Sequence, residues 1–367
     1  MTAPVHAQDA VFAEAARGEQ ADAPASSSSV DGEAGSKKPD LLFAPVPFSN
    51  PSTGTGLAGG VVAFYNPNNG PQQWISGAGV VWTERGSKGV AGFHSMSVND
   101  DRFRIMALVS YFDAVQKFYG IGIDDGDRGE VLELANKTFN AKLHAQMRVF
   151  PGGYVGVQYR LMTTNARPRD EPVATQPPPL DEMDSTLSML GPTFTYDTRD
   201  SQLQPHGGVY ASASWLFGVN ALGNTFRHNK LTLIGSAYFP FGEETVLATN
   251  ARVCAADGDV PYYDLCLFGS GAALRGYTSG RYRDGASWAV QGEIRHRFTR
   301  RWGGTAFFGM GGIAPSIGKF VDEGNLLPAA GVGVRYLPFR GNDVQLRLDV
   351  AVGYNSHGVY LGIGEAF

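Results

Sequence analysis

The sequence predicts an all-β protein, a transmembrane antiparallel β-barrel of 16 strands. Three observations favour this class. Glycine supplies 48 of 367 residues and aromatic residues 11%, whereas charged residues reach only 18% against about 25% in soluble domains. From Leu41 onward, segments of about ten residues alternate between apolar and polar side chains. Short and long connections between these segments also alternate, as they do in membrane barrels.

The composition excludes two other classes. The mean hydropathy is −0.16, and no segment approaches the roughly 18 consecutive apolar residues of a membrane helix. A barrel strand needs no such run, because only every second residue faces lipid. The net charge of −5 argues against a nucleic-acid partner, since nucleic acids bind clustered basic residues.

The predicted strands have the lengths of membrane strands. The clearest is 344–353, where Val344, Leu346, Leu348 and Val350 face one side, and Arg347 and Asp349 the other. In 286–298, Val290 and Ile294 oppose Gln291, Glu293 and Arg295, so Glu293 is expected to face the lumen. The full set is 41–47, 54–65, 73–83, 89–99, 102–113, 132–149, 154–164, 185–197, 208–217, 225–239, 245–256, 286–298, 304–313, 327–337, 344–353 and 358–367.

The connections predict the orientation of the barrel. Those after even-numbered strands are mostly short, for example Asp100-Asp101 and Gly242–Glu244, while 114–131, 165–184, 257–285 and 314–326 are long. Short periplasmic turns opposite long external loops are typical of bacterial outer-membrane barrels. We therefore expect an integral protein of the outer membrane of a Gram-negative bacterium, with both termini in the periplasm. The alternative, a soluble β-sandwich, would have strands nearer to five or six residues.

Residues 1–40 form a separate segment ahead of the barrel domain, 41–367. They contain a serine run, Ser26–Ser29, many alanines and few large apolar side chains, so we expect them to be disordered. Val5-His6-Ala7 has the small-residue character of a signal-peptidase site and indicates a signal-peptide remnant. The alternative is an ordinary flexible tail.

The cysteines, histidines and acidic clusters indicate neither a metal nor a cofactor. Cys254 and Cys266 match no zinc pattern, and a disulfide is the preferred interpretation; the alternative is two unpaired thiols. Asp124–Asp127 with Glu130 lacks the spacing of a calcium loop, so a solvated acidic loop is favoured. Gly276–Gly280 is not a nucleophile elbow, and no nucleotide fingerprint is present. We therefore expect a protein that is not an enzyme.

The chain ends on an alternating segment with a terminal aromatic residue, Val359–Phe367. Leu361, Ile363 and Phe367 are expected to share one face of the last strand. This pattern resembles the C-terminal β-signal of outer-membrane barrels. It implies the outer-membrane assembly machinery as a partner through the last strand.

One loop motif identifies a family. Leu274-Arg275-Gly276-Tyr277 resembles the (V/L)-R-G-(F/Y) motif of the BamA/TamA superfamily, also called the bacterial surface antigen family. The motif lies on the sixth external loop of that family and, by the strand count, on the sixth external loop here. Similar segments cover most of 41–367: 47–54, 118–122, 196–200, 291–295 and 331–336.

The resemblance implies that the sixth loop folds into the lumen and that Arg275 pairs with Glu293. A guanidinium can hold a carboxylate through two hydrogen bonds, and Gly276 would allow close approach to the wall. The alternative is an exposed Arg275 and a Glu293 that faces water. The family often places a second aspartate in F-x-D-x-G, where this sequence has Gly309; Asp349 is the candidate replacement. We expect the lumen around this pair to be wet.

The resemblance also implies a function: handling of polypeptide or lipid through a seam between the first and last strands. Pro45 and Pro47 in the first strand cannot donate to a ladder, so the seam should carry few hydrogen bonds. Forty residues are too few for the family's periplasmic modules, which favours membrane-protein insertion or lipid handling over secretion. The implied partners are outer-membrane lipids, including lipopolysaccharide. The alternative is a passive diffusion pore. The substrate and the oligomeric state stay open.

Overall fold

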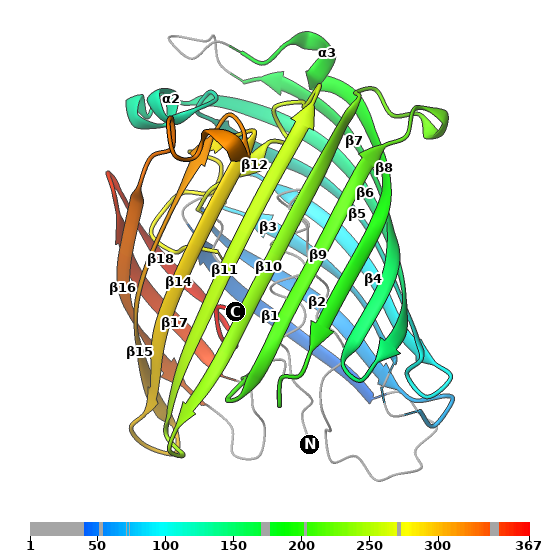
Figure 1. Cartoon of the computed structure of the whole chain (residues 1–367), viewed down its shortest axis with the longest axis vertical. Coiled ribbons are helices and arrows are strands. Elements are labelled where there is room, and N and C mark those ends of the chain that lie inside the picture. Colours follow the sequence, from blue (N-terminus) through cyan, green and yellow to red (C-terminus); the bar gives the residue numbers. More distant parts are fainter. Residues whose placement is uncertain are drawn as a thin grey trace.

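The computed structural model is a barrel of antiparallel strands with long connections at one end and short turns at the other (Figure 1). It describes residues 40–50, 54–70, 72, 74–169, 177–201, 204–269, 273–337 and 345–367. The expected disordered segment, 1–40, lies outside the described residues except for Asp40. No described helix is long and apolar enough to cross a membrane.

Sixteen strands form the wall, as the alternation predicts. They are β1 (Asp40–Asn50), β2 (Gly54–Tyr65), β3 (Trp74–Thr83), β4 (Lys88–Val98), β5 (Phe103–Phe118), β6 (Leu132–Phe150), β7 (Gly153–Pro168), β8 (Asp184–Asp197), β9 (Gly208–Gly218), β10 (His228–Phe241), β11 (Thr245–Gly258), β14 (Ala286–Arg297), β15 (Trp302–Ala314), β16 (Leu327–Tyr336), β17 (Leu346–Gly353) and β18 (Ser356–Ile363). The order closes on itself, because β1 neighbours both β2 and β18.

Short elements lie in the connections at the long-loop end. They are α2 (Ile123–Arg128), α3 (Leu180–Met183), η1 (Asn220–Leu222) and η2 (Ile317–Lys319). The connection between β11 and β14, here called loop 6 (259–285), contains a small hairpin of β12 (Cys266–Leu267) and β13 (Arg283–Asp284).

Burial follows the period of two that a barrel wall requires. Along β17, Asp349 and Ala351 are buried and face the lumen, whereas Leu348, Val350 and Val352 are exposed on the outer surface. Other strands present apolar side chains outward in the same way, among them Leu57, Val90, Val109, Leu143, Val157, Trp215, Ile294, Phe308 and Val332. The outer surface therefore has the apolar band of a membrane barrel.

Three strands in the first half of the chain continue at least three residues beyond their predicted ends: β1, β5 and β7, the last of which ends at Pro168 and not at 164. β1 has 11 residues and is not short, despite its prolines. β5 continues to Phe118, beyond the predicted end at Asp113, and pairs with β6 as far as Leu132. The prediction placed 114–131 in a loop, but Ala114 packs on the inner apolar cluster of β2–β5 and Phe118 is buried, so the inward register continues to the end of β5.

The last strand is the largest correction. β18 ends at Ile363, and the chain turns at Gly364, which has a φ of 72°. Phe367 packs inside the barrel with inward-facing Tyr238, Val246 and Ala248, whereas Leu361 is exposed on the outside. The two residues do not share a face, because alternation ends where the left-handed glycine turns the tail inward. The side chain of Ile363 lies outside the described part of the structure.

Candidate functional site

Loop 6 enters the lumen and brings the motif Leu274–Tyr277 against the inner wall. Leu274, Arg275 and Tyr277 are almost completely buried. The Tyr277 hydroxyl donates to the Pro328 carbonyl at 2.6 Å and accepts from the Tyr354 amide at 3.0 Å. These bonds attach the loop to β16 and to the turn between β17 and β18.

Two glycines make this approach possible. Gly276 has a φ of 117°, and a Cβ there would lie 3.1 Å from the Val352 backbone and from the Ala329 Cβ. Its amide donates to the Tyr360 hydroxyl at 2.8 Å. Gly309 leaves no room for a Cβ, because that atom would lie 2.5 Å from both the Leu274 side chain and the Val290 carbonyl oxygen. An aspartate of the F-x-D-x-G pattern would displace Leu274 at this position.

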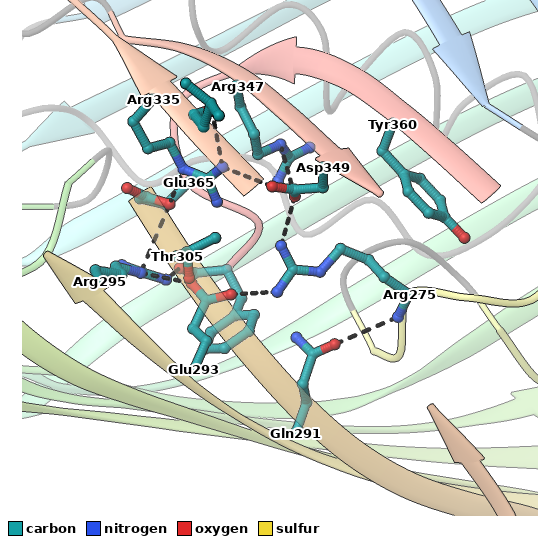
Figure 2. A network of polar contacts seen from close by, with 12 residues as sticks. Arg275, Gln291, Glu293, Arg295, Thr305, Arg335, Arg347, Asp349, Tyr360 and Glu365 are labelled. Carbon is teal, nitrogen blue, oxygen red and sulfur yellow. Dashed lines mark hydrogen bonds and ion pairs between the residues drawn. The ribbon is translucent and has the colours of Figure 1, made fainter. Parts of the chain in front are cut away.

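Arg275 contacts two carboxylates at once (Figure 2). Its Nη2 donates to Glu293 of β14, and its Nη1 lies 2.5 Å from Oδ2 of Asp349 on β17. The guanidinium also stacks on Phe307, with Cζ 3.6 Å from the ring centroid. The structure thus brings together Arg275 and Glu293, and it places Asp349 as the second acid in place of the family's aspartate.

These contacts belong to a closed ring of six charges, here called the charge ring. In order around it, the members are Arg275, Glu293, Arg295, Glu365, Arg335 and Asp349. The further separations are 2.5 Å for Glu293–Arg295, 3.6 Å for Arg295–Glu365, 2.9 Å for Glu365–Arg335 and 2.6 Å for Arg335–Asp349. Cations and anions alternate, so each charge has an opposite neighbour on both sides.

The charge ring joins elements that are distant in the sequence. It connects loop 6, strands β14, β16 and β17, and the C-terminal tail through Glu365 (Figure 2). Gln345 donates to Glu365 at 2.6 Å, and Arg295 donates to the Phe367 carbonyl oxygen at 2.9 Å. The inward-turned tail is therefore part of the same assembly as loop 6.

The expectation of a wet lumen is wrong at this position. The side chains of Arg275 and Glu293 are 1% and 0% exposed, because loop 6 covers them from above and the tail lies beside them. Solvent screening is consequently weak, and each ion pair is a strong local constraint. Every acid in the charge ring is held by at least two guanidinium groups, which suits fixing a loop better than proton transfer.

A second anchor, which the sequence analysis missed, holds the first part of loop 6, residues 259–268, here called the outer arm. Asp264 lies between Arg160 of β7 and His228 and Lys230 of β10, at 2.7, 2.8 and 3.2 Å. Burial raises the pKa of Asp264, but Arg160, Lys230 and His228 outweigh it and hold that pKa well below its usual value. The only sequence signal was the presence of charges at inward-facing positions 160 and 230.

Loop 6 also contacts neighbouring loops and carries a disulfide. Cys254 and Cys266 form a disulfide that joins the end of β11 to β12. Tyr282 donates to Asp127 at 2.9 Å, and Arg281 donates to the Gly126 carbonyl, also at 2.9 Å. The acidic segment near Asp127 therefore binds loop 6. The described residues contain no group of three or more side chains placed to hold a metal ion.

Arg283 is buried without a carboxylate partner in the part of loop 6 that the structure describes. It donates to the carbonyls of Tyr262 and Gly280 and lies 5.1 Å from the Phe118 ring centroid. Burial lowers the pKa of Arg283 to about 10. This arginine therefore connects Tyr262 in the outer arm with the later part of loop 6 at Gly280 and with Phe118 of β5.

Comparison with known proteins adds a family and a fold. The model of the Omp85 superfamily domain matches residues 78–367. The structure resembles BamA from Haemophilus ducreyi lacking POTRA domains 1–3, with a TM-score of 0.63 and 13% identity over 92% of this chain and 74% of that chain. A search of curated proteins gives no match.

Two further solved structures are similar. CdiB from Acinetobacter baumannii has a TM-score of 0.59 and 13% identity over 89% of this chain and 60% of that one. CdiB from Escherichia coli has a TM-score of 0.60 and 12% identity over 90% of this chain and 68% of that one. At these identities the likeness is one of fold.

Proposed function

This chain belongs to the Omp85 superfamily, and we propose that it acts on polypeptide or lipid by opening the seam between β1 and β18. Family membership makes it an integral protein of the bacterial outer membrane and places it among non-enzymatic barrels. The finer proposal concerns how such a barrel handles other membrane components without catalytic chemistry. It rests on the uneven hydrogen bonding of the wall.

The seam carries the proposal. β1 is registered with β18 at one position, Ser49 with Leu361, whereas β17 and β18 are registered over eight residues and β1 and β2 over eleven. β18 ends at Ile363, the Gly364 amide makes one more backbone bond, to the Gln345 carbonyl next to β17 at 2.8 Å, and the tail then turns into the lumen. Since backbone ladders hold a membrane barrel closed, the pair β1–β18 is its weakest contact.

The anchored loop argues for lateral opening over passage along the barrel axis. Loop 6 is fixed to β14, β16 and β17 by the charge ring and to β7 and β10 by Asp264. Freeing it would break several buried ion pairs, at about 3–5 kcal/mol for each charge left unpaired. Opening the seam breaks one registered contact. The easier path for a large amphipathic substrate is therefore through the wall.

We further propose the orientation and the partners. The short-turn end, where β1 begins and β18 ends, faces the periplasm, and loop 6 enters from the outside. Outer-membrane lipids, including lipopolysaccharide, surround the apolar outer face. The assembly machinery recognises the chain through β18, where Leu361 stands on the outer surface.

Reconstitution tests this function. The full chain is placed in vesicles and supplied with unfolded barrel substrates or with an asymmetric lipid distribution. We expect faster substrate insertion or faster lipid movement than in protein-free vesicles. Absence of both effects in vesicles that contain the folded barrel would refute the proposal.

A passive diffusion pore is the competing function, because 16 strands can enclose a channel. The two candidates differ in conductance. With loop 6 anchored on both walls, the barrel in a planar bilayer should show small and irregular currents. A large, steady single-channel conductance would favour the pore.

A further inference from the structure

The outer face of β5 changes from apolar to charged along its length. Its outward side chains are apolar from Phe103 to Tyr111, and the charged residues Asp113 and Lys117 follow on the same face. A strand tilted by about 40° covers roughly 20 Å of the barrel axis between Phe103 and Tyr111. Because an apolar membrane band is about 25 Å tall, Tyr111 marks the edge of this band at the long-loop end.

The same change occurs at the same height on the neighbouring strands. Tyr111 is registered with Phe139 of β6, so the apolar faces of β5 and β6 end together. At the next outward position towards the long loops, Asp113 is registered with Lys88 of β4 and with Lys137 of β6. Since neighbouring strands lie about 4.8 Å apart, the two lysines stand roughly 10 Å from each other, directly above the apolar band.

Lysine and arginine are confined to this part of the outer wall. Along the described outer faces of β2–β18 they are Lys88, Lys117, Lys137 and, on β7, Arg167. The described outer faces of β9–β18 carry neither residue type. The whole chain has a net charge of −5, so the accumulation of cations on β4–β7 is a local feature and not a consequence of composition.

The two lysines keep their charges available. Two acids nearby are already paired with arginines, Asp184 with Arg167 at 3.4 Å and Glu133 with Arg169 at 3.6 Å. Within the part of the chain that the structure describes, no carboxylate lies within ion-pair distance of Lys88 or Lys137, and both lysines are exposed. Each ammonium group therefore has donors free for the oxygens of an anion, and phosphate is a ligand that lysine binds well.

Exposed cations at the edge of an apolar wall match a lipid that carries phosphate on its headgroup. We infer that lipopolysaccharide binds to the outer face of β4–β7, with a phosphate of its lipid portion on Lys88 and Lys137. Its acyl chains then lie on the apolar surface below, where Val109 and Leu143 are 49% and 48% exposed. A soluble polyanion would use the lysines and leave this apolar surface unused. The inference rests on the proposed orientation, in which the long loops face the outside.

The test compares lipids and matched variants. The full chain in nonionic detergent micelles is offered lipid A with two phosphates, lipid A with one phosphate, or phosphatidylglycerol, and bound lipid is counted by native mass spectrometry. The wild type should bind the lipid A with two phosphates most tightly. Lys88→Gln with Lys137→Gln should weaken that binding about tenfold, roughly threefold for each exposed ion pair. Lys88→Arg with Lys137→Arg should bind like the wild type, because both charges are kept.

A control variant removes two cations elsewhere. Arg227→Gln with Lys319→Gln changes the net charge by the same amount at exposed positions of two other long loops, and should leave binding unchanged. An equal loss in this control would indicate a general charge effect and overturn the inference. Unchanged binding in Lys88→Gln with Lys137→Gln would also overturn it. So would phosphatidylglycerol bound as tightly as lipid A, or polyphosphate that competes at the affinity of lipid A, which would mean a soluble polyanion as the partner.

A labelling experiment separates the site from the proposed orientation. Val321 is 94% exposed in the connection between β15 and β16, and the native cysteines form a disulfide, so Val321→Cys provides a single free thiol. Reaction with a membrane-impermeant maleimide on intact cells, without lipid A binding by the purified chain, would refute the site alone. Reaction only after the outer membrane is disrupted would refute the orientation and the inference together. Binding through the two lysines without insertion or lipid movement in vesicles would leave the site standing and refute the seam function.

Discussion

At the scale of single residues, each carboxylate of the charge ring is shared by arginines from different parts of the chain. Glu293 is held by Arg275 and Arg295, and Asp349 by Arg275 and Arg335. The loop motif pointed to Arg275 and Glu293 in the sequence, and the gap at Gly309 pointed to Asp349. Arg295 and Arg335 lie in the family-like segments 291–295 and 331–336, but nothing in the sequence assigned them a partner, and Glu365 carried no signal.

Removing Arg275 tests the anchor directly. Arg275→Ala should leave a folded barrel, because the backbone ladder is untouched, but should make loop 6 more sensitive to protease. Because the pair is buried, removing Arg275 should weaken the attachment of loop 6 by about 3 kcal/mol or more, well above the roughly 1 kcal/mol of an exposed pair. Arg275→Lys should restore resistance only in part, since an ammonium lacks the planar fork.

A double variant supplies the control for that pair. Arg275→Ala with Glu293→Ala should be little worse than either single change, because one contact is removed twice. Full additivity of the two effects on cleavage rate would show that the residues do not interact.

The charge ring also predicts which of its carboxylates contributes more to holding loop 6. Asp349 is contacted by three guanidinium groups and Glu293 by two, so Asp349→Asn should loosen loop 6 more than Glu293→Gln. Both changes conserve shape, which makes them a matched pair. Hydrogen exchange of residues 273–280 measures the difference. A larger effect of Glu293→Gln would contradict the arrangement of the ring.

At the scale of elements, alternation predicted the wall well and the connections poorly. The inward register of Glu293, Arg347 and Asp349 could be predicted because a strand fixes every second side chain. The end of β18 could not, since it depends on Gly364 adopting a left-handed turn that the alternation does not encode. The Asp264 anchor was equally hidden, because its partners come from two strands far away in the sequence.

The outer arm of loop 6 should respond to acid. The folded-state pKa of Asp264 is depressed, so its stabilisation is present above the unfolded value of about 3.9 and is lost as pH falls through the folded pKa. Hydrogen exchange of residues 259–268 should therefore stay slow to below that pH and then accelerate. Asp264→Asn should exchange faster already at pH 7. Loss of protection in the wild type near pH 6 would contradict the assignment to this carboxylate.

At the scale of the whole molecule, the number of strands and the poor pairing of β1 with β18 could be predicted from the sequence. The register in which these two strands meet could not. Sixteen strands followed from the alternation, and prolines in the first strand pointed to poor pairing. The single register between Ser49 and Leu361 depends on how β1 and β18 slide past each other after the tail turns inward. That offset is a property of the closed barrel, in which residues more than 300 positions apart become neighbours.

A crosslink across the seam tests the central claim most directly. Ser49→Cys with Leu361→Cys places thiols at the registered pair of β1 and β18, and Val350→Cys with Val359→Cys places them at a pair within the continuous ladder of β17 and β18. In reconstituted vesicles, oxidation should abolish substrate insertion and lipid movement in the first variant, and reduction should restore them. The second variant should be unaffected by either treatment. Undiminished activity with the first crosslink fully formed would contradict function through this seam.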